Sequence, residues 1–225
     1  MKYINKQDEP IVLIKFIKNK KTPNYFNLNP KQKKTIRKKL LEDQGYICCY
    51  CQKRIDSKKV DGQVRAEIEH IKAQSNCTDI ETVQYQNLLI SCDGNQQKNN
   101  KNIDEKDRHC NNFRQNKDLF INLLDSSCED LIFYDDIGNI HAKDDDEKIN
   151  ITIDNLNLRI LKANRKAHID GFFSVHNRST LTYKKLINQI KTLSLKSNLD
   201  NDGIDKYQEY SGVIINLLKQ LGGIK

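Results

Sequence analysis

Residues 46–54, YICCYCQKR, begin a stretch of the chain that closes with RHCNNFRQNK at residues 108–117. Between them lie RAEIEHIKA at 65–73 and NLLISCD at 87–93. The stretch holds two separated groups of cysteines, and four of these thiols suit one tetrahedral zinc site: Cys48, Cys51, Cys92 and Cys110. Zinc bound in this way would fold a small module around the metal.

Two substitutes within this ligand set stay open at the level of sequence. Cys49 is adjacent to Cys48 and could replace it, and His109 could replace Cys110. Imidazole and thiolate are both ordinary zinc ligands, so the spacing alone does not choose between them.

The pieces between the cysteines predict a strand, a second strand and a helix. Glu69 and His70 end one short apolar stretch, Asn87 begins another, and Asn111 stands where a helix can start. We therefore expect an α+β protein that is mainly helical, built on a zinc-stapled strand–strand–helix module.

Three segments are expected along the 225 residues. Residues 1–45 form a basic segment in which Asn29 and Pro30 predict a helix start and Gly45 its end. Residues 46–125 form the zinc module. Residues 126–225 contain LIFYDDIGNIHA at 131–142, a hairpin pattern, and continue with apolar residues at helical spacing, which predicts a helical lobe.

Composition limits the class of protein. Hydrophobic residues make up 37%, and no run approaches the roughly 20 apolar residues of a membrane span. The seven cysteines are an odd number and no signal peptide opens the chain, so we expect a soluble, cytoplasmic protein with reduced thiols.

The net charge of +8 is concentrated at the start of the chain. Residues 1–45 carry eleven Lys and one Arg against four acidic residues, which accounts for the whole excess. A basic segment beside a reactive site suits a phosphate backbone, although a solvated Lys-rich helix has the same composition. The candidate DNA-binding residues are Lys33, Lys34, Arg37, Lys38, Lys39 and Arg114.

The central motif suits phosphodiester hydrolysis, which needs an activated water and a metal that neutralises charge. His70 is the candidate general base. Glu69 and Asn111 offer oxygen ligands for Mg²⁺, with Asn112 as a neighbouring alternative to Asn111. Asn87 would support the strand that carries His70.

One geometric condition applies to this site. Neighbouring residues of a regular strand point to opposite faces, so Glu69 and His70 reach one site only if the backbone bends. Glu67 is the fallback carboxylate.

These residues resemble the HNH endonuclease superfamily, whose ββα-metal fold carries a His base, a positioning Asn and a further metal ligand. His70, Asn87 and Asn111 occupy those positions, and Glu69 stands where many members carry Asp. Together with LNLRILKANRKAHIDGF at residues 156–172, the motifs are similar to the PtuB family, the HNH subunit of the Septu anti-phage defence system, also found in some retron systems.

The resemblance implies a metal-dependent DNA endonuclease of bacterial antiviral defence, with structural Zn²⁺ and catalytic Mg²⁺. It also implies a PtuA-like ATPase partner, for which the lobe after Asp154 would be a docking surface. The competing classes are a stand-alone HNH restriction enzyme and a catalytically idle zinc module that binds nucleic acid. The helical lobe shows no recognisable motif for reading DNA sequence, and the intact Glu69, His70 and Asn111 favour the enzyme.

Overall fold

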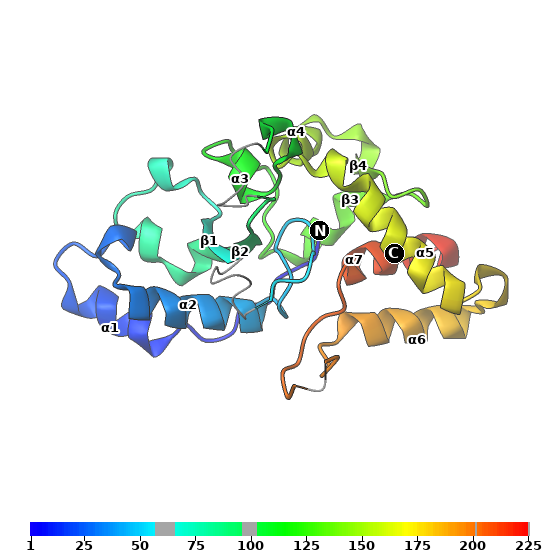
Figure 1. The fold of residues 1–225 in the computed structure, drawn as a ribbon, viewed down its shortest axis with the longest axis horizontal. Coiled ribbons are helices and arrows are strands. Elements are labelled where there is room, and N and C mark those ends of the chain that lie inside the picture. Colours follow the sequence, from blue (N-terminus) through cyan, green and yellow to red (C-terminus); the bar gives the residue numbers. More distant parts are fainter. Residues whose placement is uncertain (57–65, 96–102, 201, 225) are drawn as a thin grey trace.

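The computed structural model describes residues 1–56, 66–95, 103–200 and 202–224. About half of the protein is helical, and two small antiparallel sheets complete an α+β fold, as predicted (Figure 1). Part of the linker between Cys92 and Cys110 lies outside the described residues. The helices and strands are α1 Ile11–Asn19, α2 Pro30–Asp43, β1 Ala66–His70, β2 Leu88–Cys92, α3 Asn111–Arg114, β3 Ile132–Tyr134, β4 Ile140–Ala142, α4 Glu147–Asn155, α5 Lys162–Val175, α6 Tyr183–Ser194 and α7 Ser211–Gly222.

Helix α2 begins where Asn29 and Pro30 predict. The Asn29 side chain accepts from the Gln32 amide at 2.9 Å, and the Gln32 side chain accepts from the Asn29 amide at 2.9 Å. This reciprocal pair satisfies two amides that the helix start leaves without partners. The helix ends at Asp43, just before Gly45, whose φ is +59°. A Cβ at position 45 would meet the Tyr207 ring at 2.3 Å, so the turn needs glycine there.

The first sheet carries the central motif. Strands β1 and β2 pair antiparallel, with Glu69 opposite Leu89 and His70 opposite Leu88. The Gln44 side chain, just after α2, bonds both the amide and the carbonyl of Ile90 at 2.7 and 2.8 Å. These bonds fix β2 against the end of α2, so the basic helix lies alongside the sheet (Figure 1).

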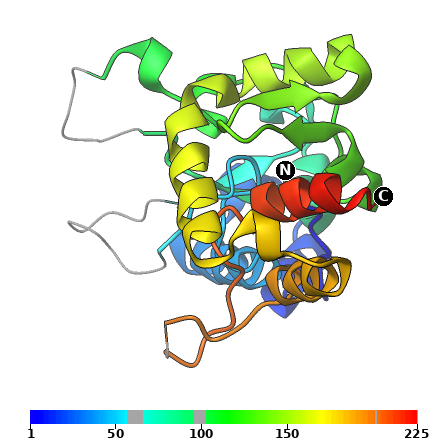
Figure 2. The same ribbon diagram turned by 90° about the vertical axis from the view of Figure 1, so that its right-hand side faces the viewer.

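The second sheet is the predicted hairpin of β3 and β4, and helices α4 to α7 follow it in the chain. Figure 2 shows α7 between this hairpin and α6. The Asn216 side chain on α7 accepts from the Tyr134 amide at 3.0 Å and donates to the Ile132 carbonyl at 3.3 Å. Helix α7 is therefore held against the second sheet by side-chain bonds to the backbone of β3.

The buried apolar side chains form one continuous cluster that runs from Met1 to Leu218 and crosses all three predicted segments. The Ile4 amide donates to the Leu123 carbonyl at 2.9 Å, and the Gly212 amide donates to the Gln52 side chain at 2.8 Å. The segments share one core. Within the described part of the chain, no helix combines the length and the apolar composition that crossing a bilayer demands.

Candidate zinc site and nuclease site

Four buried thiols converge as the sequence predicts. The sulfurs of Cys48, Cys51, Cys92 and Cys110 all lie within 4.8 Å of one another. The Sγ atoms of Cys48 and Cys110 are 3.8 Å apart, and those of Cys51 and Cys92 are 3.7 Å apart. A tetrahedral zinc with Zn–S bonds near 2.3 Å requires sulfurs separated by about 3.8 Å. The cluster therefore has the size to hold one structural zinc ion.

Tight turns bring the thiols together. The Gln52 amide bonds the Cys48 carbonyl at 3.1 Å, closing the Cys48–Cys51 turn, and the Cys92 amide donates to the Cys48 sulfur at 3.3 Å. Gly94 follows Cys92 with φ +54°, and a Cβ there would lie 2.0 Å from the His109 carbonyl oxygen. Only glycine permits this approach of the two chain segments.

The structure places Cys48 and Cys110 in the cluster, and the two alternative ligands, Cys49 and His109, beside it. Cys49 is buried, but its sulfur is not in the group of four, and its amide bonds the Ile90 carbonyl at 3.1 Å. His109 is a neighbour, with Nδ1 at 3.2 Å from the Cys110 sulfur. Burial opposes ionisation of Cys48, yet hydrogen bonds with Cys110 and the other nearby thiols lower its pKa well below 9.0. A thiolate is the form that binds zinc.

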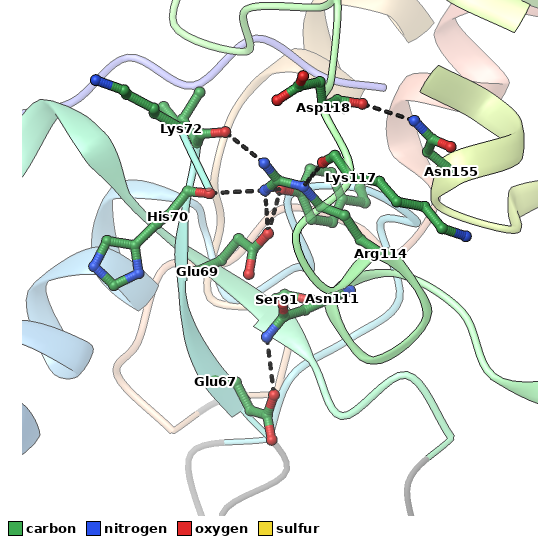
Figure 3. A network of polar contacts seen from close by, with 12 residues as sticks. Glu67, Glu69, His70, Lys72, Ser91, Asn111, Arg114, Lys117, Asp118 and Asn155 are labelled. Atoms are coloured by element: carbon green, nitrogen blue, oxygen red, sulfur yellow. Dashed lines mark hydrogen bonds and ion pairs between the residues drawn. The ribbon is translucent and has the colours of Figure 1, made fainter. Parts of the chain in front are cut away.

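Strand β1 is regular, so Glu69 and His70 do not share a site. Figure 3 shows the Glu69 carboxylate directed toward Arg114 and the His70 ring directed away from it. Tyr50 donates its hydroxyl to Glu69 at 2.9 Å, and Arg114 forms an ion pair with the same oxygen. Burial raises the pKa of Glu69, although Arg114 and Tyr50 oppose the shift. Glu69 is thus buried and paired through one carboxylate oxygen with Tyr50 and Arg114.

The structure does not place Arg114 with the exposed basic residues. Its side chain is 1% exposed, and its guanidinium occupies a ring of acceptors. Besides Glu69, these are the carbonyls of His70 at 2.7 Å, Ile71 at 2.7 Å and Lys117 at 2.9 Å, and the Tyr50 hydroxyl at 3.1 Å. Arg114 ties α3 to the end of β1 and has no donor turned to solvent for DNA.

Arg114→Ala is expected to destabilise the fold by about 3–5 kcal/mol, because it leaves the Glu69 carboxylate buried without its counter-charge. Denaturant unfolding measures this. Arg159→Ala is the matched control, since Arg159 pairs with Asp154 at 2.7 Å on the surface and such pairs contribute only about 0.2–1 kcal/mol. Equal destabilisation of the two variants would contradict the structural role of Arg114.

His70 is held in one orientation. Its Nε2 lies 3.0 Å from the Thr82 carbonyl oxygen, and its ring meets the edge of Tyr25 at a centroid distance of 5.0 Å. A carbonyl only accepts, so in the neutral ring Nε2 carries the hydrogen and Nδ1 keeps its lone pair. Burial lowers the pKa of His70 below 6.5, which favours this neutral form near pH 7. The ring is therefore set to accept a proton at Nδ1.

Asn87 bonds the backbone across the turn that follows β1. Its Oδ1 accepts from the Lys72 amide at 2.9 Å, and its Nδ2 donates to the Glu81 carbonyl at 3.0 Å. Glu81 immediately precedes Thr82, whose carbonyl holds His70. Asn87 thus joins the end of β1 to the segment that orients the imidazole.

Asn111 meets Glu67 instead of Glu69. Its Nδ2 donates to the Glu67 carboxylate at 3.0 Å, and its backbone amide donates to the Ser91 hydroxyl at 3.4 Å (Figure 3). Asn112 turns toward the Asp93 carbonyl, at 3.4 Å. Both Glu67 and Asn111 are partly exposed, so an amide oxygen and a carboxylate are accessible together where α3 begins.

The basic residues of α2 divide into two groups. Lys38 and Lys39 lie beside acidic residues one turn later, 3.8 Å from Glu42 and 2.7 Å from Asp43. Lys33 and Arg37 face elsewhere, toward Tyr25. The Lys33 ammonium lies 4.3 Å from the Tyr25 ring centroid, and the Arg37 Nε is buried without a hydrogen-bond partner among the described residues. Lys34 is exposed.

Tyr25 connects these groups, and sequence reasoning did not single it out. It contacts the His70 ring and the Lys33 ammonium. Burial raises the pKa of its hydroxyl, with Arg37 opposing and Glu67 adding to that shift, so both charges lie near it. The only signal in the sequence is an aromatic pair within the Pro- and Asn-containing link TPNYFNLNP at residues 22–30.

No family model matches the chain, and none of the curated proteins is similar to it in sequence.

Proposed function

We propose that this protein is a metal-dependent DNA endonuclease of the HNH type, with a structural zinc and His70 as general base. The observation that carries the proposal is the orientation of His70. Its Nε2 is bound to the Thr82 carbonyl, which leaves Nδ1 free to accept a proton from water. The strand–strand–helix order of β1, β2 and α3 around four clustered cysteines supports the same class.

The residues around Tyr25 suit a phosphodiester. Lys33 lies over the Tyr25 ring and Arg37 brings a second positive charge near the Tyr25 hydroxyl, while the same ring contacts that of His70. Guanidinium groups match the paired oxygens of a phosphate. We therefore assign phosphate binding to Lys33 and Arg37, ahead of the ion-paired Lys38 and Lys39.

Glu67 and Asn111 are the oxygen-bearing pair that the structure brings together for a divalent metal, on the face of β1 that Glu67 shares with Glu69 and opposite the His70 ring. Mg²⁺ is commonly held by one or two carboxylates together with water and phosphate oxygens, and this pair offers a carboxylate and an amide oxygen. Such an ion would neutralise charge that develops on the phosphate. Glu69, the first choice from sequence, is committed to Arg114 and Tyr50, so the fallback carboxylate Glu67 takes this role.

A change in salt dependence tests the phosphate assignment. A double variant in which both Lys33 and Arg37 are changed to Gln should have a flatter slope of log affinity against log salt concentration. The change should be about 0.9 for each phosphate that the protein no longer neutralises. Replacing Lys38 and Lys39 should change the slope less, because Glu42 and Asp43 already offset their charge. Fluorescence anisotropy with labelled DNA, on a His70→Ala background that prevents cleavage, measures the slopes.

Lys148→Gln, far along the chain on α4, is the control for removal of one surface charge. If the slope were unchanged in the Lys33 and Arg37 variant, these residues would not bind phosphate and would belong to a solvated or protein-binding surface.

A role in cytoplasmic anti-phage defence with a PtuA-like ATPase is proposed from the sequence resemblance alone. Deleting residues after Leu181 to find the docking surface would remove α7, whose Val213, Ile214 and Leu218 are at most 1% exposed. Binding to the ATPase is therefore best examined with the whole chain.

A further inference from the structure

Phe26 is an exposed aromatic residue on a fixed turn. Its side chain is 79% exposed, although Leu28, two residues later, is buried. The short helix η1, Tyr25–Asn27, is closed by the Asn24 side chain, which accepts from the Asn27 amide at 3.1 Å. The Tyr25 amide also donates to the Thr82 hydroxyl at 3.0 Å. The turn is thus tied to the segment that orients His70, and it presents Phe26 to solvent.

The surroundings of Phe26 favour a polyanion. Residues 10–41 contain ten Lys and Arg residues and not one Asp or Glu. Lys20 and Lys21 are exposed before the turn, and Lys34 is exposed after it. A second protein chain would need a strongly acidic apolar surface to match this region. Nucleic acid combines negative charge with flat rings that stack on aromatic side chains.

We propose that Phe26 is a stacking platform for an unpaired base of the strand whose phosphate lies at Lys33 and Arg37. This inference rests on the proposed nuclease function and narrows its substrate to single-stranded or locally opened nucleic acid. Tyr25, the residue next to Phe26, contacts both His70 and Lys33, so the platform lies one residue away from the proposed reaction site. Paired bases inside a duplex are stacked on their neighbours and do not offer their faces to a protein side chain.

Binding of labelled oligothymidylate, alone and as a duplex with oligoadenylate, tests the proposal on the full chain carrying His70→Ala. Phe26→Ala should weaken binding to the single strand by about 5- to 150-fold, the range for removal of one stacked base. Binding to the duplex should stay unchanged. Phe26→Trp should retain single-strand binding, whereas Phe26→Leu should lose most of it despite its apolar character.

An unaltered single-strand affinity in Phe26→Ala would overturn the proposal, as would an equal reduction on both DNA forms. If Phe26→Ala bound DNA normally but no longer bound the proposed ATPase partner, the turn would be a protein-docking surface instead. Cleavage by the unmodified protein is measured separately. If the unmodified protein binds single strands through Phe26 but cuts no DNA, the nuclease function fails and the stacking role of Phe26 stands. If it cuts DNA and Phe26→Ala binds single strands normally, the nuclease function stands and the stacking role fails.

Discussion

Cys48→Ala is expected to abolish zinc binding and to unfold the part of the protein around β1, β2 and α3. Structural zinc contributes about 10–16 kcal/mol in small zinc-binding domains, which is as large as the whole stability of most domains. The four thiols join residues as far apart as Cys48 and Cys110, so loss of the metal releases both ends of the module. Metal analysis of the purified protein and thermal unfolding measure the two effects.

Cys49→Ala is the matched control. Cys49 is adjacent, equally buried and chemically identical, but its sulfur is outside the cluster. It should keep one zinc per chain. If Cys49→Ala lost zinc and Cys48→Ala retained it, Cys49 would be the ligand in place of Cys48. If the unmodified protein held far less than one zinc per chain, the zinc site would be wrong.

His70→Ala is expected to reduce divalent-dependent DNA cleavage by about 10²- to 10⁴-fold while the protein keeps its zinc and its fold, since removal of a general base typically has this effect on the rate. The variant removes the Nδ1 lone pair, which the bond between Nε2 and the Thr82 carbonyl leaves available for a proton. Plasmid cleavage under single-turnover conditions, with Mg²⁺ added, gives the rate.

His141→Ala is the comparison for removal of an imidazole. His141 lies on the β3–β4 hairpin, where it stacks on Phe133 at 4.7 Å and pairs with Asp135. Its removal should leave the cleavage rate unchanged. Cleavage by His70→Ala at the rate of the unmodified protein would show that the nuclease site lies elsewhere.

Local patterns were sufficient for much of the fold. The start of α2 follows from Asn29 and Pro30, which cap a helix through bonds to residues a few positions away. The β3–β4 hairpin follows in the same way from its turn residues. A zinc cluster follows from two cysteine groups at the two ends of one module, and the structure then chose Cys48 over Cys49 and Cys110 over His109.

The roles of individual charged residues were less predictable. From sequence, Arg114 and Arg37 are both basic residues near the motif. In the structure Arg114 is buried against Glu69, while Arg37 has a buried donor without a partner among the described residues. Glu69 and Arg114 are 45 positions apart, and no local pattern shows that two such residues meet.

The sequence by itself determined an α+β chain with a four-cysteine cluster, a basic helix before it, and the order of strands and helix that carries His70. Only the tertiary structure decided that Glu67, and not Glu69, meets Asn111, and that Tyr25 joins His70 to Lys33. The physical reason is that spacing along a strand or helix fixes which side a residue faces, whereas its partner depends on how distant segments pack. Alternation along β1 separates Glu69 from His70, and the burial of Arg114 then gives the Glu69 carboxylate its counter-charge.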